Sequence, residues 1–193
     1  IRTALLEQRF LVGDAALATQ LNQRLEDELF KGSETEFVTA KLAERDERHE
    51  RQGERYVVEP NVKEGKGGLR DLQSLYWIAK YVHHVEQIED LVRLKVFRPE
   101  EYERFQKAEN FLWAVRCHLH LVTNRPNEQL TFDLQVEVAE RMGYEDCAGR
   151  RAVEHFMQDY FRNATRVGDL TRIFLTKPEA IHAKPEPLLQ RIF

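Results

Sequence analysis

The sequence VEHFMQDYFRNATRVGDLTRIFLTK, at residues 153–177, carries the strongest structural signal in the chain. Its apolar and small residues recur in alternating steps of four and three, at Val153, Met157, Tyr160, Ala164, Val167, Thr171 and Phe174. Such a stripe predicts an α-helix of about seven turns that packs along one side against other helices. The chain is therefore expected to be built from long helices.

Helical periodicity and capping signals extend through most of the remaining sequence. Helices are predicted over residues 5–13, 14–30, 33–53, 69–82, 88–95, 99–123 and 133–143. Ser33 and Glu36 have the spacing of a capping box. Tyr56 begins a short β-branched and aromatic run. The expected fold is mainly α, a helical bundle of long antiparallel helices with at most one short extended element near residues 56–59.

The composition is typical of a globular protein. The 193 residues are 42% hydrophobic and 32% charged, which argues against a disordered chain. No apolar run approaches the roughly 20 residues that span a bilayer, and a net charge of -4 gives no bulk attraction to nucleic acid or anionic membrane. Cys117 and Cys147 lack CxxC spacing and are expected to be ordinary thiols, at least half buried.

The segment PNVKEGKGGLRD, at residues 60–71, carries the strongest local chemical signal. Its glycines permit positive φ and close backbone approach, and it runs into a helix start whose N–H groups favour phosphate. Lys63, Lys66 and Arg70 add positive charge. The segment is neither a Walker A loop nor a GxGxxG motif. The alternative interpretation is a glycine turn with Arg70 and Asp71 in structural ion pairs.

Several catalytic patterns are absent from the sequence. A nucleotidyltransferase of the polymerase-β type needs Asp-x-Asp about ten residues after a Gly-Gly or Gly-Ser turn, because these carboxylates hold magnesium. Here Gly67-Gly68 leads into a helix without that pair. There is no GxSxG and no His-Asp dipeptide. His118 and His120 are two apart on a predicted helix and diverge, so no metal site is predicted.

Three segments carry a resemblance to a known family. They are VEPNVKEGKGGLRDLQSLYWIAKY (58–81), FLWAVRCHLHLVTNRPNEQLTFDLQVEVAERMGY (111–144) and AVEHFMQDYFRNATRVGDLTR (152–172). They closely resemble the sequence that follows the nucleotidyltransferase domain in the bifunctional PII uridylyltransferase/uridylyl-removing enzymes. The resemblance covers nearly the whole chain, and three long motifs in the same order make it specific.

The resemblance implies a cytoplasmic bacterial transferase of nitrogen regulation and glutamine sensing, which uses Mg²⁺ and UTP to transfer UMP to a tyrosine of the PII protein. It implies four regions, which are helices resembling the end of the nucleotidyltransferase region (1–53), a glycine-rich connecting motif (54–71), a helical bundle (69–177) and a linker toward an HD domain (178–193). The family's catalytic carboxylates and HD motif are expected outside this chain. The chain alone is therefore expected to be inactive and to hold no metal or cofactor of its own.

The resemblance also assigns candidate site residues. One group is expected to face the nucleotide cleft, where it would contact the UTP phosphates or help two domains close on each other. It comprises Asn61, Lys63, Lys66, Gly67, Gly68, Arg70 and Asp71. A possible surface for PII or for the flanking nucleotidyltransferase and HD domains comprises Arg116, His118, Arg125 and Asn127. Helix packing and capping are the alternative roles of these four residues. No nucleic-acid or membrane partner is implied.

Rival functions of two classes remain open at this point. One class is a related nucleotidyltransferase. It could be the adenylyltransferase of glutamine synthetase, although Leu69-Arg70-Asp71-Leu72-Gln73 resembles the uridylyltransferases more closely, or one of the nucleotidyltransferases joined to cyclic-nucleotide and CBS domains. The other is a non-catalytic helical docking module, which would bind PII or space its neighbouring domains without touching nucleotide. Convergence of Lys63, Lys66 and Arg70 on one concave patch would favour the nucleotide cleft over the docking module.

Overall fold

The computed structural model describes residues 1–52, 57–85, 87 and 89–175. Its helices are α1 (Arg2–Leu6), α2 (Ala15–Leu25), the π-helical turn η1 (Glu26–Phe30), α3 (Glu34–Gln52), α4 (Leu69–His83), α5 (Asp90–Arg93), α6 (Pro99–Thr123), α7 (Phe132–Arg141) and α8 (Ala152–Leu175). Within these ranges there is no strand, only two isolated β-bridges. The prediction of a mainly α fold is confirmed.

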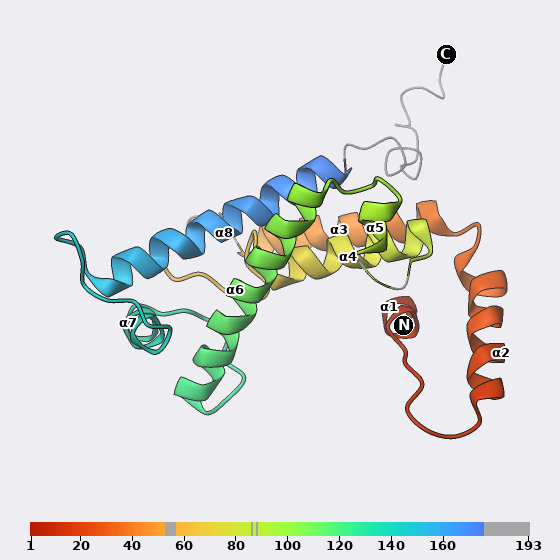
Figure 1. The fold of residues 1–193 in the computed structure, drawn as a ribbon, viewed down its shortest axis with the longest axis horizontal. Helices are drawn as coiled ribbons and strands as arrows, with labels where there is room; N and C mark the ends of the chain where they lie inside the picture. Colours follow the sequence, from red (N-terminus) through yellow and green to blue (C-terminus); the bar gives the residue numbers. More distant parts are fainter. Residues whose placement is uncertain (53–56, 86, 88, 176–193) are drawn as a thin grey trace, which may run out of the picture.

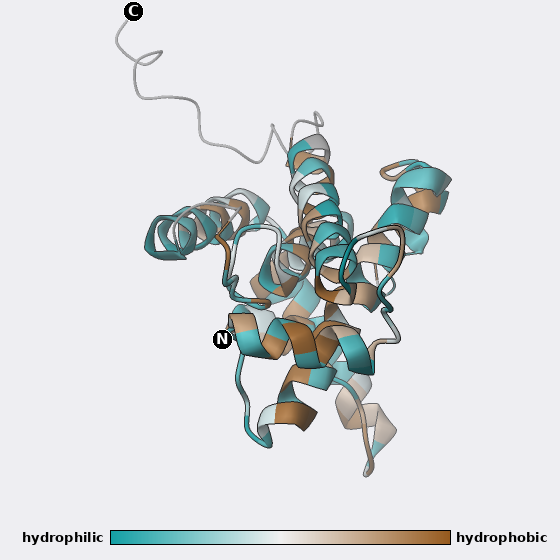
Figure 2. Ribbon diagram, turned by 90° about the vertical axis from the view of Figure 1, so that its left-hand side faces the viewer, coloured by the Kyte–Doolittle hydropathy of each residue, from teal (hydrophilic) through white to brown (hydrophobic). Residues whose placement is uncertain are grey.

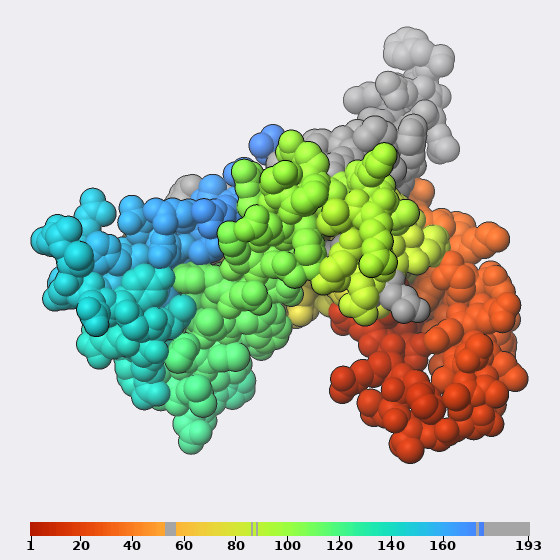
Figure 3. Space-filling model, viewed as in Figure 1, coloured from red at the N-terminus to blue at the C-terminus, as the bar shows by residue number. Residues whose placement is uncertain are grey.

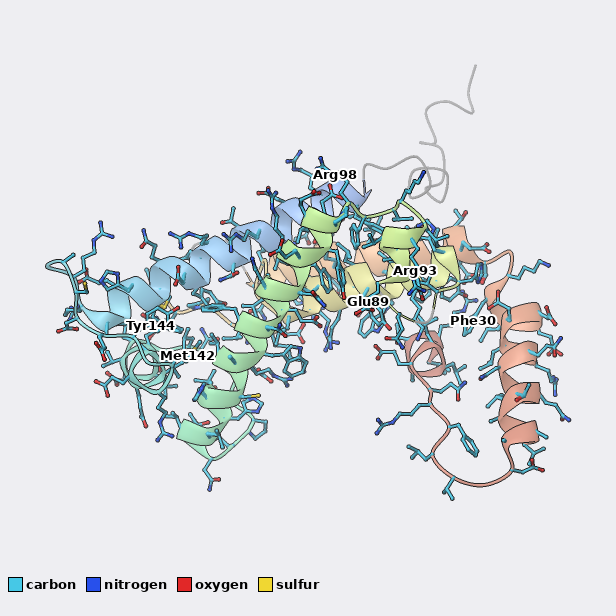
Figure 4. All side chains as sticks on the ribbon, viewed as in Figure 1. Phe30, Glu89, Arg93, Arg98, Met142 and Tyr144 are labelled. Carbon is cyan, nitrogen blue, oxygen red and sulfur yellow. The ribbon has the colours of Figure 1, made fainter. Side chains whose placement is uncertain are left out.

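The long helices α4, α6 and α8 form the centre of the molecule (Figure 1). Helix α8 packs against α4, α6 and α7, and α3 packs along α4. Helix α7 lies at one end of this body and α2 at the other (Figure 1). Tyr144, just after α7, donates a hydrogen bond to Asp159 of α8 at 3.0 Å, which helps to hold that end together (Figure 4).

The core forms where the predicted apolar stripes meet. On α8, Tyr160, Val167 and Phe174 are buried as their four-and-three spacing predicted. The facing sides of α4 and α6 add further buried residues, among them Leu72, Leu75, Ile78, Leu112, Val115 and Leu119. Figure 2 shows hydrophobic residues mainly on the helix sides that face the centre. No helix in the described part of the chain is long and apolar enough to cross a membrane.

The N-terminal region differs from the prediction. The first helix ends at Leu6 instead of near Gly13, and Phe10 is half exposed. The second predicted helix is present, with Asp14 accepting a hydrogen bond from the Ala16 N–H, but α2 buries none of its residues. In the space-filling view this region touches the helical body at its upper side, and a gap separates its lower part from α6 and α7 (Figure 3). Leu6 and Phe30 reach the core, whereas Leu11, Val12 and Leu17 stay exposed.

The connection between α2 and α3 is fixed by Ser33, although not through the predicted capping box. The Ser33 hydroxyl bonds the carbonyl oxygens of Leu29 and Phe30, at 2.7 and 2.9 Å. Glu36, the expected capping partner, forms an ion pair with Arg2 instead. The serine therefore closes the end of the π-helical turn.

The extended element expected near residues 56–59 is not a strand in the part that is described. Residues 57–59 are irregular, and Tyr56 lies outside the described residues. The bridge comes slightly later, where Asn61 pairs with Gln129. Two loops, 57–62 and 127–132, are joined there, and we call them the paired loops. Backbone bonds run from the Val62 N–H to the Glu128 oxygen, at 2.8 Å, and from the Leu130 N–H to the Pro60 oxygen, at 2.9 Å.

Replacing Tyr81 with phenylalanine is expected to lower the free energy of unfolding by about 1 kcal/mol. The Tyr81 hydroxyl lies 2.7 Å from the Ser33 hydroxyl, while its ring stacks on Phe37 with centroids 3.9 Å apart. Phenylalanine keeps the stacking and loses the hydroxyl. Phe30, which packs edge-on against the same ring, marks this junction in Figure 4. Urea unfolding measures the change, and an unchanged midpoint would contradict it.

Candidate functional site

The glycine-rich motif begins with a turn that Asn61 closes. The Asn61 side-chain oxygen accepts hydrogen bonds from the N–H groups of Lys63, at 3.1 Å, and Glu64, at 2.7 Å. The Asn61 carbonyl accepts a third, from the Gly65 N–H at 3.0 Å. Asn61 thus shapes the loop itself, a role that short polar side chains commonly take in turns.

The first N–H groups of α4 already have acceptors within the motif. The Leu69 N–H donates to the Val62 oxygen at 3.1 Å, and the Arg70 N–H donates to the Lys63 oxygen at 2.9 Å. The N–H of Asp71 donates to the Gly68 oxygen at 3.1 Å. The free helix N-terminus that the sequence suggested as a phosphate site is therefore occupied by the protein's own carbonyl groups.

Gly67 and Gly68 are needed for internal packing. Gly67 has a φ of +79°, and a Cβ at this position would lie 2.2 Å from the Ala164 carbonyl oxygen of α8. A Cβ on Gly68 would lie 2.7 Å from the Val62 carbonyl oxygen. Glycine permits both the positive φ and the close approach. The close backbone approach predicted from the glycines is made to α8 and to the loop, in the interior of the protein.

Asp71 is buried, with 3% of its surface exposed, and fastens the motif to α3. Its carboxylate pairs with Arg48, lies 2.9 and 3.0 Å from His49 Nε2, and accepts a hydrogen bond from the Gly67 N–H at 2.8 Å. Burial raises the pKa of Asp71, but the hydrogen bond and charge of His49, the Gly67 N–H and the charge of Arg48 outweigh it, so its pKa lies below the ordinary 3.8. Asp71 is thus an ionised anchor between α3 and α4.

A basic cavity of about 390 Å³ opens between α3, α4 and the N-terminal helix. The residues that line it are Thr3, Lys41, Glu44, Arg48, Arg51, Gln52, Glu64, Arg70 and Trp77. Four of these are basic and two are acidic. Arg70 bonds Glu64 and, at 3.0 Å, Gln73, and its guanidinium lies 5.6 Å from the centre of the Trp77 ring. The cavity thus combines cations with an aromatic floor, a combination suited to an anion.

Two residues lining this cavity have a buried N–H group without an acceptor. They are Arg48, at its Nε, and Trp77, at its indole Nε1. Each residue is 7% exposed. Glu64 Oε2 lies 3.8 Å from Arg48 Nε, beyond hydrogen-bond distance. A buried donor without an acceptor costs about 1–3 kcal/mol, so such groups point to a missing partner.

The predicted cations of the motif do not gather at this cavity. Arg70 lines it, whereas Lys63 and Lys66 do not. Lys63 Nζ lies 3.9 Å from Glu64. The other cations of the cavity come from α3. Lys41, Glu44, Arg48 and Arg51 follow one another in steps of three and four, so their spacing does place them on one side of a helix.

The four residues of the possible partner surface have different environments. Arg116 holds Glu128 of the paired loops through bonds of 2.8–3.1 Å. Burial raises the pKa of Glu128, but the hydrogen bonds and charge of Arg116 outweigh this effect, so the pKa lies below its ordinary value. Asn127 bonds Gln129 and closes a local turn. His118 is partly exposed and Arg125 is exposed. Only part of the predicted surface therefore faces outward.

Both cysteines also differ from the prediction. Cys117 and Cys147 are exposed free thiols, whereas the sequence suggested that they were at least half buried. Cys117 lies on α6 one residue after Arg116, and periodicity alone did not place it on the outer side.

Comparison with known proteins identifies related sequences. The family described as GlnD PII-uridylyltransferase matches residues 36–175. The chain is 70% identical over 193 residues to the bifunctional uridylyltransferase/uridylyl-removing enzyme of Ruegeria pomeroyi, with 100% of this chain and 21% of the relative covered. It is 62% identical over 194 residues to the enzyme of the same name from Cereibacter sphaeroides, covering 100% of this chain and 21% of that relative. No solved structure matches.

Proposed function

Because the chain belongs to the PII-uridylyltransferase family, we propose that it is the helical domain of an enzyme that transfers UMP from UTP to a tyrosine of the PII protein. The chain spans about one fifth, 21%, of the length of the curated relatives it matches. In this proposal the chain forms one wall of the nucleotide cleft and part of the surface that meets PII. The enzyme acts in the cytoplasm, and the flanking nucleotidyltransferase and HD domains are its neighbours.

The position of Arg70 carries this proposal. Arg70 belongs to the glycine-rich motif and lines the basic cavity, so the segment that resembles the family most closely also contributes a cation to a concave surface. An arginine can hold a phosphate through two parallel hydrogen bonds. Holding the triphosphate in position raises the rate without direct participation in the chemistry.

Magnesium and UTP belong to the proposed enzyme as a whole. Mg²⁺, where it is bound, stabilises the charge of the transferring phosphoryl group. In the described ranges no three His, Cys, Asp or Glu side chains come together in a group that could hold a metal ion. The chain's own residues orient the nucleotide, and the carboxylates that hold the metal are proposed to lie elsewhere in the enzyme.

The proposed domain division follows the resemblance. In this proposal residues 1–53 continue the nucleotidyltransferase region and residues 69–177 form the helical bundle. The glycine-rich motif, 54–71, connects these two regions. The gap between α3 and α4 coincides with the connecting segment. The proposed linker, 178–193, lies outside the described residues. On the PII-facing side, we assign the role of contact to His118 and Arg125, because Arg116 and Asn127 are engaged within the chain.

In the full-length enzyme, Arg70→Ala is expected to reduce kcat/KM for UMP transfer to PII by about tenfold or more, since a charge-assisted contact to phosphate is lost. Arg70 is part-buried, and its partners Glu64 and Gln73 retain access to water, so the helical content should not change. Transfer of labelled UMP to PII measures the effect, and circular dichroism checks the fold. Wild-type kinetics in the variant would contradict the proposal.

The docking module is a second candidate, and two observations favour it. Lys63 and Lys66 do not line the cavity, and the N–H groups at the start of α4 are occupied. If Arg70→Ala leaves UMP transfer unchanged while His118→Ala or Arg125→Ala weakens binding of PII, the chain acts as a docking surface. The names of the relatives favour uridylylation over the adenylyltransferase alternative.

A further inference from the structure

We propose that the basic cavity between α3 and α4 is a binding site for a phosphoanhydride anion, either the triphosphate tail of the nucleotide or free pyrophosphate. This inference rests on the proposed function for the choice of anion. It also adds Arg48, Arg51 and Trp77, three residues that the glycine-rich motif does not include, to the binding surface.

The first argument is the charge of the cavity. Four basic and two acidic side chains line it, and both carboxylates are already engaged, Glu44 with Lys41 and Glu64 with Arg70. Arg48 pairs with Asp71 and Arg51 lies 3.6 Å from Glu47, but neither of these carboxylates lines the cavity, so the wall itself carries more cations than carboxylates. A volume of about 390 Å³ is within the range of small-molecule sites. A multiply charged anion fits this excess better than a single carboxylate does.

The second argument is the two donors without acceptors. Arg48 Nε and Trp77 Nε1 are buried N–H groups on opposite helices, one on α3 and one on α4, and both residues line the same cavity. An indole N–H can only donate, and so can a guanidinium. A ligand that satisfies both must therefore present acceptor atoms on more than one side, which a di- or triphosphate does.

The third argument is the pair of cations, Lys41 and Arg70, that lie over the Trp77 ring. Lys41 Nζ lies 5.2 Å from the centre of the Trp77 ring, and the Arg70 guanidinium lies over the same ring. Both side chains are long, and each is paired with a carboxylate of the lining, Lys41 with Glu44 and Arg70 with Glu64. In the proposal an entering anion takes the place of these carboxylates and binds both cations. The cation–π contacts hold the cations in place until the ligand arrives.

The test measures binding of inorganic pyrophosphate, UTP and uridine to the full-length protein by isothermal titration calorimetry. The variants are Trp77→Phe, which keeps an aromatic ring and removes the N–H, and Arg51→Gln, which removes an exposed cation. The matched control is Arg45→Gln, on the same helix but away from the cavity lining. Each cavity variant should weaken binding of the phosphorylated ligands about tenfold, leaving uridine unaffected.

The outcomes separate the ligands. If the cavity variants bind only UTP more weakly, the ligand is the triphosphate tail. If they bind pyrophosphate more weakly, the ligand is free pyrophosphate, the leaving group of UMP transfer. Either result supports the anion site. Affinities in Trp77→Phe and Arg51→Gln equal to those of wild type and Arg45→Gln would overturn it. Should Trp77→Phe fail to fold, Arg51→Gln carries the test, because its side chain is exposed.

Two measurements, UMP transfer by the wild type and anion binding by the cavity variants, distinguish this inference from the proposed function. If the wild type transfers UMP to PII while the cavity variants bind both anions normally, the anion site is wrong and the proposed function stands. If the wild type transfers no UMP but the cavity variants lose pyrophosphate binding, the proposed function is wrong and the anion site stands.

Discussion

Asp71→Ala is expected to lower the free energy of unfolding by about 3–5 kcal/mol, because it leaves the buried charge of Arg48 without its partner. The carboxylate also accepts the Gly67 N–H and lies 2.9 Å from His49, so the substitution removes several partners at once. Urea unfolding of the 193-residue chain at neutral pH measures the loss. A change below about 1 kcal/mol would show that the ion pair contributes little net stability.

A matched control separates a buried carboxylate from an exposed one. Asp46 lies on α3 and pairs with Arg45, and its side chain is 62% exposed. Asp46→Ala should change the free energy of unfolding by less than about 1 kcal/mol. Equal effects at Asp71 and Asp46 would mean that burial of the anchor is unimportant.

The pH dependence of stability provides a second measurement on Asp71. Its pKa in the folded protein lies below the ordinary 3.8. The stability from its ionised form is therefore fully present above about pH 4 and is lost as the pH falls through the lower, folded-state pKa. Asp71→Asn should remove this part of the acid sensitivity. A variant that loses stability with falling pH as steeply as the wild type does would contradict the assignment.

Gly67→Ala is expected to destabilise the protein by about 3 kcal/mol or more, combining a left-handed backbone with a collision. The added Cβ would lie 2.2 Å from the Ala164 carbonyl oxygen, and backbone atoms of a helix cannot easily give way. Thermal and urea unfolding measure the effect. The variant should also lose UMP transfer in the full-length enzyme, because the motif can no longer rest on α8.

Gly143→Ala is the control for the backbone conformation alone. Gly143 has a φ of +80°, and nothing lies within 4 Å of an added Cβ. Its substitution should cost only about 1–2 kcal/mol, the penalty for the left-handed conformation. Similar losses at Gly67 and Gly143 would show that contact with α8 does not constrain the motif.

Most of the helices could be predicted because their signals are local. Pro99 at the first turn of α6 and the four-and-three stripe of α8 depend only on neighbours along the chain, and both helices formed as predicted. The first helix was predicted too long, because Phe10 fits the local periodicity but finds no core to enter. In this segment, local periodicity without a buried partner did not extend the helix beyond Leu6.

The candidate site was less predictable because its contacts join distant segments. Arg70 was identified from its motif, whereas Arg48 and Trp77 gave no local sign of sharing a cavity. Arg48 lies in a run of mixed charges, and its burial against Asp71 depends on how α3 packs on α4. Likewise, a sequence cannot show that the Val62 and Lys63 carbonyls occupy the N–H groups that a phosphate would need.

The paired loops have a consequence for how this chain can vary in length. The Val62 N–H donates to the Glu128 oxygen and the Leu130 N–H to the Pro60 oxygen, and the Gln135 side chain donates to the Val58 oxygen at 2.7 Å. An insertion in 124–131 would shift these partners and the buried Leu130, and so displace the glycine-rich motif. Insertions and deletions in one of the paired loops should therefore be tolerated only when the other loop changes as well. The lengths of the two loops are thus expected to vary together among related sequences.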